Sequence, residues 1–389
     1  MKIASRMENL SPSLTLAITA LAGELKAQGK DILSFSAGEP DFDTPQVIKD
    51  AAIAAINNGK TKYTAVAGTL ETKQAIIGKL QRDHGLKYKS DEVIVSNGAK
   101  HSLFNLFQCL VDTGDEVIIP APYWVTYPEQ VKFSNGVPVV IDTNDTTNFK
   151  ITPEQLQSAI TPKTKILLLN TPSNPTGAVY TKEELTALAV VLKGTDIIVL
   201  SDEMYEKIMY DGKQFTSVAS ISDDMFQRTV TINGISKAVA MTGWRYGYLA
   251  TPNKELIKAM VKLQGQVTSN VNSITLQAAI TALDGSADAD IEMMRKEFER
   301  RRDIALDAFN AIKGLSCLAP DGAFYLFVNI SEFSKDSMKF AADLLEKEGV
   351  AIIPGLAFGT EGYFRFSFAT DEATIREGIA RIKRFVEKN

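Results

Sequence analysis

Between residues 92 and 233, short runs of mostly apolar residues alternate with longer stretches in which apolar residues recur every three or four positions. The apolar runs cover residues 93–96, 117–120, 137–141, 166–170, 197–201 and 229–233. Continuous apolar runs are typical of parallel strands covered on both faces, and the longer stretches are typical of amphipathic helices. The alternation therefore predicts an α/β fold in which a mostly parallel sheet lies between helices.

The two ends of the chain follow a different pattern. Together they predict an arm at 1–11, a helix at 12–28, a short strand at 32–36, a long helix at 287–312 and strands at 322–329 and 363–369. The last two strands alternate with helical stretches after residue 252. We therefore expect a second, smaller sheet in the C-terminal third of the chain.

Composition narrows the class of protein. The chain has 389 residues, enough for two or three domain-sized units, and 45% of them are hydrophobic. Lys+Arg total 42 and Asp+Glu total 47, a net charge of -5, and no concentrated basic stripe favours nucleic-acid binding. The densest basic run, Arg300 to Arg302, lies in a helical pattern with interleaved acids, so we expect a solvated helix face.

The cysteines and histidines do not have the spacing of a metal site. Cys109 and Cys317 lie in apolar surroundings, which predicts two buried free thiols and a reducing compartment. His84 and His101 do not complete a zinc site with them, so no metal is expected. Without a signal-peptide core or a run of 18 apolar residues, we expect a cytoplasmic protein with no membrane span.

The segment GISKAVAMTGWRYG, residues 234–247, follows the last apolar run and carries Lys237 between small residues. A lysine held there can be partly desolvated, and burial favours the neutral amine that attacks an aldehyde. Arg245, eight positions later, offers a planar fork of donors that fits a phosphate. A lysine with a phosphate anchor is what pyridoxal 5'-phosphate (PLP) requires, whereas the alternative is a surface lysine beside a structural arginine.

Polar residues also follow the earlier apolar runs, where ligands bind in parallel sheets. Gly98 precedes a helix and leaves N–H groups for an anion, and Asp202 is costly to bury unless a cation pairs with it. Trp124 offers a flat ring for stacking, and Asn174 stands between two prolines. Each residue also has an ordinary explanation: a plain turn, core packing or, for Asp202, a helix N-cap.

Residues 234–247 resemble the PLP-attachment signature of class I aminotransferases, which have PLP fold type I. The similarity runs through Gly234, Ser236, Lys237, Ala240, Met241, Gly243, Arg245 and Gly247. The segment departs from the family at Tyr246, where an aliphatic residue is usual, and many relatives carry a serine in place of Gly234. We expect Ser236 or a backbone N–H to replace that hydroxyl at the phosphate.

Other motifs resemble the family in the same order along nearly the whole chain: the Gly38 loop, Tyr63, the Gly98 turn, NPTG at 174–177, DEMY at 202–205 and Arg365. The chain thus resembles the aspartate aminotransferases of the bacterial and plastid-like branch, which includes aspartate/prephenate aminotransferases. The resemblance implies a large domain with a seven-stranded sheet and a smaller α/β domain. The implied bounds are 1–44 for the arm and part of the small domain, 45–285 for the large PLP-binding domain and 286–389 for the small C-terminal domain.

The resemblance also implies a role for each site residue. Lys237 would form the Schiff base and carry the proton, with Asp202 and Tyr205 beside it as catalytic residues. Cofactor contacts would come from Gly98, Ala99, Lys100, Trp124, Asn174, Asp202, Tyr205, Ser236, Lys237 and Arg245, and from Tyr63 of the neighbouring subunit. Substrate contacts would come from Gly38, Trp124, Asn174, Arg365, Lys100, Ser13 and Thr15.

The implied reaction is ping-pong transamination between L-aspartate and 2-oxoglutarate by a homodimer with shared sites. A bifunctional aspartate/prephenate enzyme, an aromatic-preferring aminotransferase and a lyase on the same fold are the enzymatic alternatives. A PLP-dependent regulator or binding module is the alternative from another class. It is disfavoured because the chain has no basic helix-turn-helix pattern and carries Lys237, Asp202, Asn174 and Arg365 together.

Overall fold

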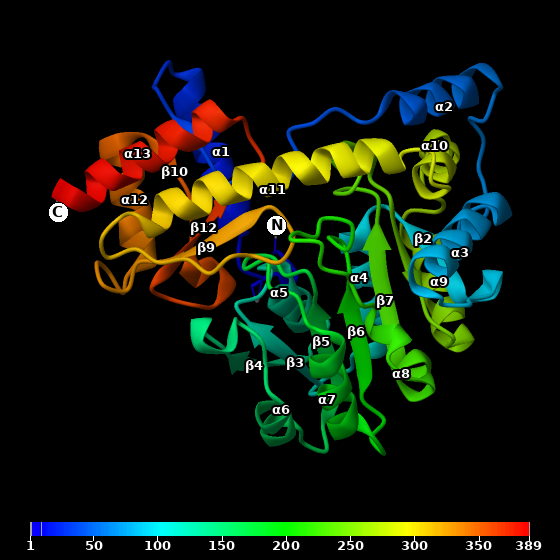
Figure 1. Cartoon of the computed structure of the whole chain (residues 1–389). Helices are drawn as coiled ribbons and strands as arrows, with labels where there is room; N and C mark the ends of the chain where they lie inside the picture. The colour runs from blue at the N-terminus through cyan, green and yellow to red at the C-terminus, as the bar shows by residue number, and fades with distance from the viewer. Residues whose placement is uncertain (1, 9, 389) are drawn as a thin grey trace.

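The computed structural model describes residues 2–8 and 10–388 and has the predicted α/β fold (Figure 1). A seven-stranded sheet flanked by helices forms the larger part, and a smaller group of helices and short strands lies beside it. Of the predicted arm at 1–11, residues 1 and 9 lie outside the described residues, and Ser5–Met7 form one 3-10 turn.

The large sheet has the order β2-β8-β7-β6-β5-β3-β4. Its strands are β2 (Val93–Ser96), β3 (Glu116–Ala121), β4 (Val137–Asp142), β5 (Thr164–Asn170), β6 (Ile198–Asp202), β7 (Thr229–Gly234) and β8 (Gly247–Ala250). The six predicted strands are confirmed within a few residues. β8 was not predicted from its pattern, because its four residues continue directly from the glycine-rich Lys237 segment. It is antiparallel to both neighbours, whereas the other pairings in this sheet are parallel.

Apolar side chains cover both faces of this sheet, as the continuous strand pattern predicts. The helices of this part are α2 (Gln46–Asn57), α3 (Leu70–His84), α4 (Ala99–Leu110), α5 (Thr126–Phe133), α6 (Pro153–Ala159), α7 (Lys182–Leu192), α8 (Asp223–Arg228), α9 (Lys254–Val267) and α10 (Ser273–Leu283). α4 and α9 contribute to the core on one face, and α6 and α7 to the core on the other. The predicted capping box at the start of α7 is present: Thr181 and Glu184 each accept a hydrogen bond from the other's backbone N–H.

The smaller part joins the two ends of the chain. It contains α1 (Leu14–Ala27), β1 (Leu33–Ser34), β9 (Tyr325–Asn329), α12 (Ser337–Glu348), β10 (Val350–Ala351), β11 (Ile353–Pro354), β12 (Tyr363–Ser367) and α13 (Glu372–Lys388). β1 pairs in parallel with β10, and β12 lies between β11 and β9. The N-terminal stretch is therefore built into the same unit as the C-terminal third.

The long helix α11 (Asp288–Asn310) runs from the large sheet's helices to the smaller part (Figure 1). The expectation that Arg300 to Arg302 form a solvated face was wrong for two of the three. Arg301 and Arg302 are 6% and 3% exposed, because this face of α11 packs against loops that supply acids. Arg302 pairs with Asp211 at 2.7 Å and Arg301 with Asp41 at 2.8 Å, so both charges are balanced.

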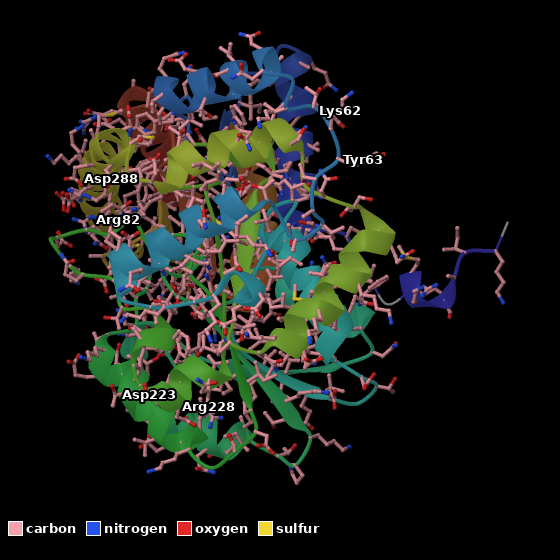
Figure 2. The ribbon with its side chains drawn as sticks, turned by 90° about the vertical axis from the view of Figure 1, so that its right-hand side faces the viewer. Lys62, Tyr63, Arg82, Asp223, Arg228 and Asp288 are labelled. Carbon is pink, nitrogen blue, oxygen red and sulfur yellow. The ribbon has the colours of Figure 1, made fainter. Side chains whose placement is uncertain are left out.

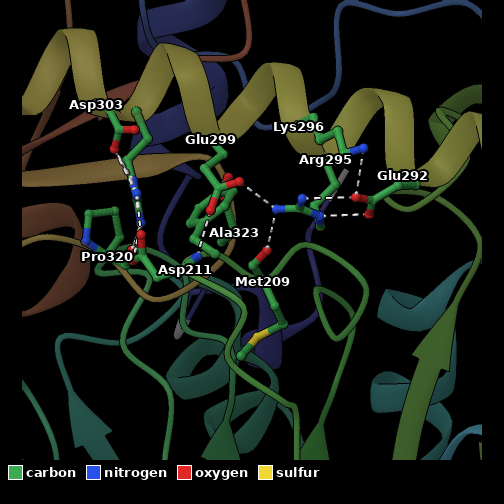
Figure 3. Close-up of polar contacts among 11 residues, drawn as sticks. Met209, Asp211, Glu292, Arg295, Lys296, Glu299, Asp303, Pro320 and Ala323 are labelled. Carbon is green, nitrogen blue, oxygen red and sulfur yellow. Dashed lines mark hydrogen bonds and ion pairs between the residues drawn. The ribbon is translucent and has the colours of Figure 1, made fainter.

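Polar contacts continue along α11 toward its N-terminus (Figure 3). The guanidinium of Arg295 donates to the carbonyl oxygen of Met209 at 3.1 Å and to the carboxylate of Glu299 at 2.8 Å. Glu299 in turn accepts the backbone N–H of Asp211 at 2.6 Å. This helix therefore holds the loop at 209–211, which follows the predicted site residues Asp202 and Tyr205.

The two cysteines are free, but each is only partly buried, so the prediction of buried thiols was too strong. Each is partly buried and packs against a hydrophobic core, and burial raises the pKa of both thiols. None of the helices in the described part of the chain combines the length and apolarity that a membrane crossing needs.

Candidate active site

A cavity of about 380 Å³ lies where the carboxyl ends of the large sheet meet the smaller part. This is the place where ligands bind in open parallel sheets, and the volume suits a small ligand. Of the predicted site residues, the cavity is lined by Ser13, Thr15, Gly38, Ala99, Lys100, Trp124, Asn174, Asp202, Tyr205, Ser236, Lys237, Arg245 and Arg365. Segments spread over the whole chain therefore converge on one site.

Lys237 lies in the loop after β7, and its Nζ donates a hydrogen bond to the carbonyl oxygen of Gly38. Burial lowers the pKa of Lys237 to about 8; Glu39 acts to raise it, and Arg365 and Arg245 lower it further. The neutral amine that a nucleophile requires is therefore a minor form at pH 7, about a tenth, but far more abundant than for an ordinary lysine.

Asp202 ends β6 and is 4% exposed. Its Oδ2 accepts the hydroxyl of Tyr127 at 2.8 Å, and its Oδ1 accepts the N–H of Met204 at 3.2 Å. Burial raises the pKa of Asp202, while Tyr127, Met204 and the charge of Lys237 act to lower it. The Met204 contact is the one expected of an aspartate that caps a helix, but residues 204–207 form turns rather than a helix. Asp202 is therefore not a helix N-cap, and it lines the cavity.

The N-terminus of α4 meets Arg245 at one end of the cavity. A Cβ on Gly98, the N-cap with φ of 85°, would lie 2.3 Å from a guanidinium nitrogen of Arg245. A Cβ on Gly247 would lie 2.2 Å from the backbone nitrogen of Ala99. Both glycines therefore allow the arginine and β8 to approach the helix terminus. Gly98 itself donates its N–H to Ser96 at 2.8 Å, so Ala99 and Lys100 supply the first-turn donors that face an anion.

Arg365 lies on β12 and is 3% exposed. Its Nη1 donates to Oδ1 of Asn174 at 2.9 Å and its Nη2 to the carbonyl oxygen of Ser36 at 2.7 Å. The guanidinium carbon lies 4.4 Å from the ring centre of Tyr325 and 5.2 Å from that of Phe358. Its Nε has no hydrogen-bond partner among the described residues, which leaves a buried donor for a ligand.

Sequence reasoning missed Tyr127 and Tyr325, which also line the cavity. The hydroxyl of Tyr325 lies 2.9 Å from that of Tyr205, and a Cβ on Gly38 would lie 3.2 Å from it. Neither tyrosine belongs to a motif with its own chemistry. Their one sequence signal was position: Tyr127 follows Trp124 by three residues, and Tyr325 opens the strand β9 that pairs with the strand of Arg365.

Lys100 and the start of α1 form the outer wall of the cavity. The Nζ of Lys100 lies 4.7 Å from the ring centre of Trp124. Lys100 is exposed as a whole residue, but partial desolvation lowers its pKa, and the charge of Arg245 lowers it further. Ser13 caps α1, and its hydroxyl lies 2.9 Å from that of Thr15. A cation and two hydroxyl groups are thus available to a second acidic group of a ligand.

Tyr63 does not reach the cavity of its own chain. It lies on the segment between α2 and α3, is 92% exposed and projects from the surface (Figure 2). The 3-10 turn at Ser5–Met7 stands off the body on the same side of the molecule (Figure 2). The predicted contact of Tyr63 with a neighbouring subunit stays a prediction.

The two departures from the attachment signature are neighbours in space. Gly234 pairs with Gly247 across β7 and β8, and a Cβ on Gly234 would lie 2.8 Å from the carbonyl oxygen of Tyr246. Tyr246 is fully buried in the core beside α3 and α10. Ser236, which we expected to replace the missing hydroxyl, is 6% exposed and lines the cavity.

A second group of charged side chains lies outside the cavity, and we name it the α3 cluster: Lys79, Asp83, His84, Glu206 and Lys207. Glu206 contacts both Lys79 and His84, and Lys207 lies 2.8 Å from Asp83. Carboxylate and imidazole atoms of Asp83, His84 and Glu206 lie within 4.8 Å of one another. The two ammonium groups already balance the two carboxylates, so the cluster is an ion-pair network rather than a metal site.

The residues around the cavity fit PLP. Lys237 offers an amine of lowered pKa, and Arg245 with the N-terminus of α4 offers an anion site. Asp202 offers a buried carboxylate whose charge needs a cation such as a protonated pyridine nitrogen. One cavity therefore holds a group for each functional end of this cofactor.

Comparison with known proteins gives the same assignment. The family model described as aminotransferase class I and II matches residues 30–382. The chain is 50% identical to an aspartate aminotransferase of Bacillus subtilis, with all of both chains covered. It is 48% identical to an aspartate/prephenate aminotransferase of Nitrosomonas europaea, covering 98% of this chain and 99% of the relative. The solved aspartate aminotransferase of Thermus thermophilus with maleate superposes with a TM-score of 0.95 at 44% identity, covering 99% of each chain.

Proposed function

The chain belongs to the class I and II aminotransferase family, and we propose that it transfers the amino group of L-aspartate to 2-oxoglutarate, giving oxaloacetate and L-glutamate. It is an enzyme, and its cofactor is PLP, on which this family depends. The observation that carries the substrate assignment is a pair of cations, Arg365 and Lys100, lining one cavity with the Lys237 amine. An amino dicarboxylate needs one cation for each carboxylate. Maleate, named with the Thermus structure, is also a four-carbon dicarboxylate.

Bound PLP supplies a ring that accepts electrons from the substrate Cα. The Nζ of Lys237, whose pKa is lowered to about 8, would take the proton from the substrate Cα and deliver it to the carbon of the cofactor's aldehyde group. Asp202 holds the proton on the ring nitrogen. Since the first 2-oxo acid leaves before the second arrives, these steps predict ping-pong kinetics.

The other site residues bind and orient. Arg365 and Asn174, joined by a 2.9 Å hydrogen bond, hold the α-carboxylate beside Gly38. Lys100, with Ser13 and Thr15, holds the distal carboxylate. Of the remaining residues, Asn174 and Tyr205 would hold the ring oxygen of PLP and Trp124 its ring face. Ala99, Lys100, Ser236 and Arg245 would hold the phosphate, and Gly98 would let Arg245 approach it.

Prephenate is a second candidate amino acceptor. The Nitrosomonas relative, named aspartate/prephenate aminotransferase, favours it at 48% identity. Prephenate carries two carboxylates, so the same two cations suit it. An enzyme that prefers aromatic amino acids is less well supported, because Lys100 places a charge where their uncharged rings would lie.

We also infer a cytoplasmic homodimer in which Tyr63 completes the partner's phosphate site. The support is the 92% exposure of Tyr63, together with exposed Ile53 and Ile56 of the preceding helix α2. Arg245, at the cavity's phosphate end, is itself exposed in the single chain. Free, partly buried thiols at Cys109 and Cys317 suit a reducing compartment.

The division into 1–44, 45–285 and 286–389 is likewise a proposal. The parallel pairing of β1 with β10 supports placing the N-terminal stretch with the small domain. The start of α11 near residue 286 supports the second boundary, since this helix leads into the smaller part.

The test is a panel of donors and acceptors with the purified protein reconstituted with PLP. We expect aspartate and glutamate as donors and 2-oxoglutarate as acceptor, with prephenate as the added arm. Borohydride reduction and peptide mapping should place the PLP label on Lys237. No label, or turnover of phenylalanine well above that of aspartate, would contradict the proposal.

A further inference from the structure

Tyr127 joins two groups that face the cavity. It lies in the first turn of α5, and its hydroxyl donates to Oδ2 of Asp202 at 2.8 Å. Its ring meets that of Trp124 edge to face, with centres 5.4 Å apart and planes at 86°. Its backbone N–H donates to the carbonyl oxygen of Trp124 at 3.0 Å, so one short turn fixes both rings.

This hydrogen bond bears on the charge of Asp202. Burial favours the neutral carboxylic acid, and the described donors that oppose it are Tyr127 on Oδ2 and the N–H of Met204 on Oδ1. Tyr127 is 1% exposed, and burial together with Asp202 raises its pKa well above the ordinary value. The hydroxyl therefore stays protonated and remains a donor at working pH.

We propose that Tyr127 is a positioning residue that keeps Asp202 ionised and oriented, so that the proton of the pair resides on the cofactor's ring nitrogen. The inference rests on the proposed PLP function and assigns to this chain a residue outside the motifs. Without the hydroxyl, Asp202 becomes more basic in a site that already favours neutral groups, and the shared proton moves from the ring nitrogen to the carboxylate. The ring then accepts electrons less well, which slows the proton transfer at Cα but not aspartate binding.

The experiment compares the Tyr127→Phe holoenzyme with the parent, both loaded with PLP labelled with ¹⁵N in the ring. The ¹⁵N resonance should move from the pyridinium position toward that of neutral pyridine. With aspartate, kcat should fall about 10–100-fold, the loss of one charge-assisted hydrogen bond, while KM changes by less than about threefold. Tyr248→Phe is the matched control, because it removes a fully buried hydroxyl without a hydrogen-bond partner among the described residues.

A double-variant cycle separates action through Asp202 from simple packing. In an Asp202→Asn background, Tyr127→Phe should change kcat by less than about twofold, because the group through which it acts is gone. Equal losses in both backgrounds, or an unmoved ¹⁵N resonance in Tyr127→Phe, would overturn the inference. If Tyr127→Phe does not fold, 4-aminophenylalanine at position 127 keeps the ring and offers a weaker N–H donor in place of the hydroxyl. It should move the resonance toward neutral pyridine, and an unmoved signal would overturn the inference.

Borohydride labelling of the parent distinguishes a failure of the proposed PLP function from a failure of the proposed role of Tyr127. A parent without label on Lys237 would mean that the proposed PLP function fails. A labelled parent with an unchanged ¹⁵N resonance in the variant would mean that only the role of Tyr127 fails.

Discussion

Two groups of buried charge lie at the two ends of one short segment, residues 202–207, and they handle charge in opposite ways. At its start, Asp202 faces the cavity with Lys237 and Arg365. At its end, Glu206 and Lys207 enter the α3 cluster, where acids and bases of the same chain contact each other. In the cavity, by contrast, the buried Nε of Arg365 has no partner among the described residues.

The difference separates stability from function. When two buried charges of the same chain pair with each other, removing only one of them strongly destabilises the protein. The remaining charge is then buried without compensation. A charge that faces a cavity is held by the surrounding fold and is available to a ligand. The α3 cluster therefore holds the segment that carries Asp202 and Tyr205, and so positions these two side chains at the cavity.

The largest expected effect is on the cavity side. Lys237→Ala should lower kcat for aspartate and 2-oxoglutarate by at least about 10⁴-fold, because it removes both the covalent anchor and the proton carrier. Its Tm without cofactor should stay the same or rise, since a desolvated amine is lost. Steady-state kinetics measures the change in kcat, and calorimetry measures the change in Tm. A Tm drop as large as that of a core cavity would contradict the comparison.

The next effect is on the cluster side. Glu206→Ala should lower the free energy of unfolding by about 3–5 kcal/mol, because Lys79 and His84 lose a buried partner and only Asp83 is left to balance Lys79 and Lys207. Denaturant titration measures this, and the matched control is Glu255→Ala. Glu255 pairs with Lys258 at 2.7 Å but its side chain is 83% exposed, so about 0–1 kcal/mol is expected. Equal losses in the two variants would remove the distinction between paired buried charge and surface charge.

The same cluster should respond to acid. Burial acts to raise the pKa of Glu206, but Lys79 and His84 hold it well below its ordinary value of 4.5. As pH falls, the unfolded chain takes up the proton first, so the stabilisation is complete above about pH 4.5 and is lost progressively below it. The stability difference between the parent and Glu206→Gln should therefore shrink below that pH. A difference that stays constant down to pH 3 would argue against this sign.

A smaller effect concerns specificity in the cavity. Lys100→Ala should lower kcat/KM for aspartate about 10–100-fold, the value of one charge-assisted hydrogen bond, and leave phenylalanine nearly unchanged. Lys132→Ala, which removes a lysine whose side chain is 44% exposed and paired with Glu129, is the control. An equal loss for both donors would mean that Lys100 only positions the cofactor.

The smallest effect concerns the partner subunit. Tyr63→Phe should weaken PLP retention about tenfold, the lower end of the value of a hydrogen bond to a charged group. Hybrids with Lys237→Ala should regain the parent's PLP retention at one site, because that site holds Lys237 from one chain and Tyr63 from the other. No regain after confirmed subunit exchange would mean that sites are complete within one chain. A lesion at Glu206 cannot be rescued in this way, since the α3 cluster lies within one chain.

The sequence by itself determined the layered α/β fold, because apolar runs of strand length between helical periods leave few other ways to bury their faces. It also supplied the chemistry of Lys237, Asp202 and Arg365, since those side chains lie in motifs whose residue types state what they can do. The strand β8 could not be predicted from the sequence, because four residues after a glycine-rich loop are too few to show a strand pattern. The burial of Arg301 and Arg302 escaped it because periodicity shows a helix face but not which loop covers that face.

Only the tertiary structure decided which polar groups meet across long separations. Tyr127 reaches Asp202 from 75 residues away, Tyr325 reaches Tyr205 from 120, and Glu206 reaches Lys79 from 127. From the sequence, a tyrosine in an apolar stretch is predicted only to be a buried core residue. The hydrogen-bond partner of its hydroxyl depends on how the strands and helices pack. The tertiary structure therefore sets the charge states in the cavity, because each pKa shift there depends on neighbours that come together only when the chain is folded.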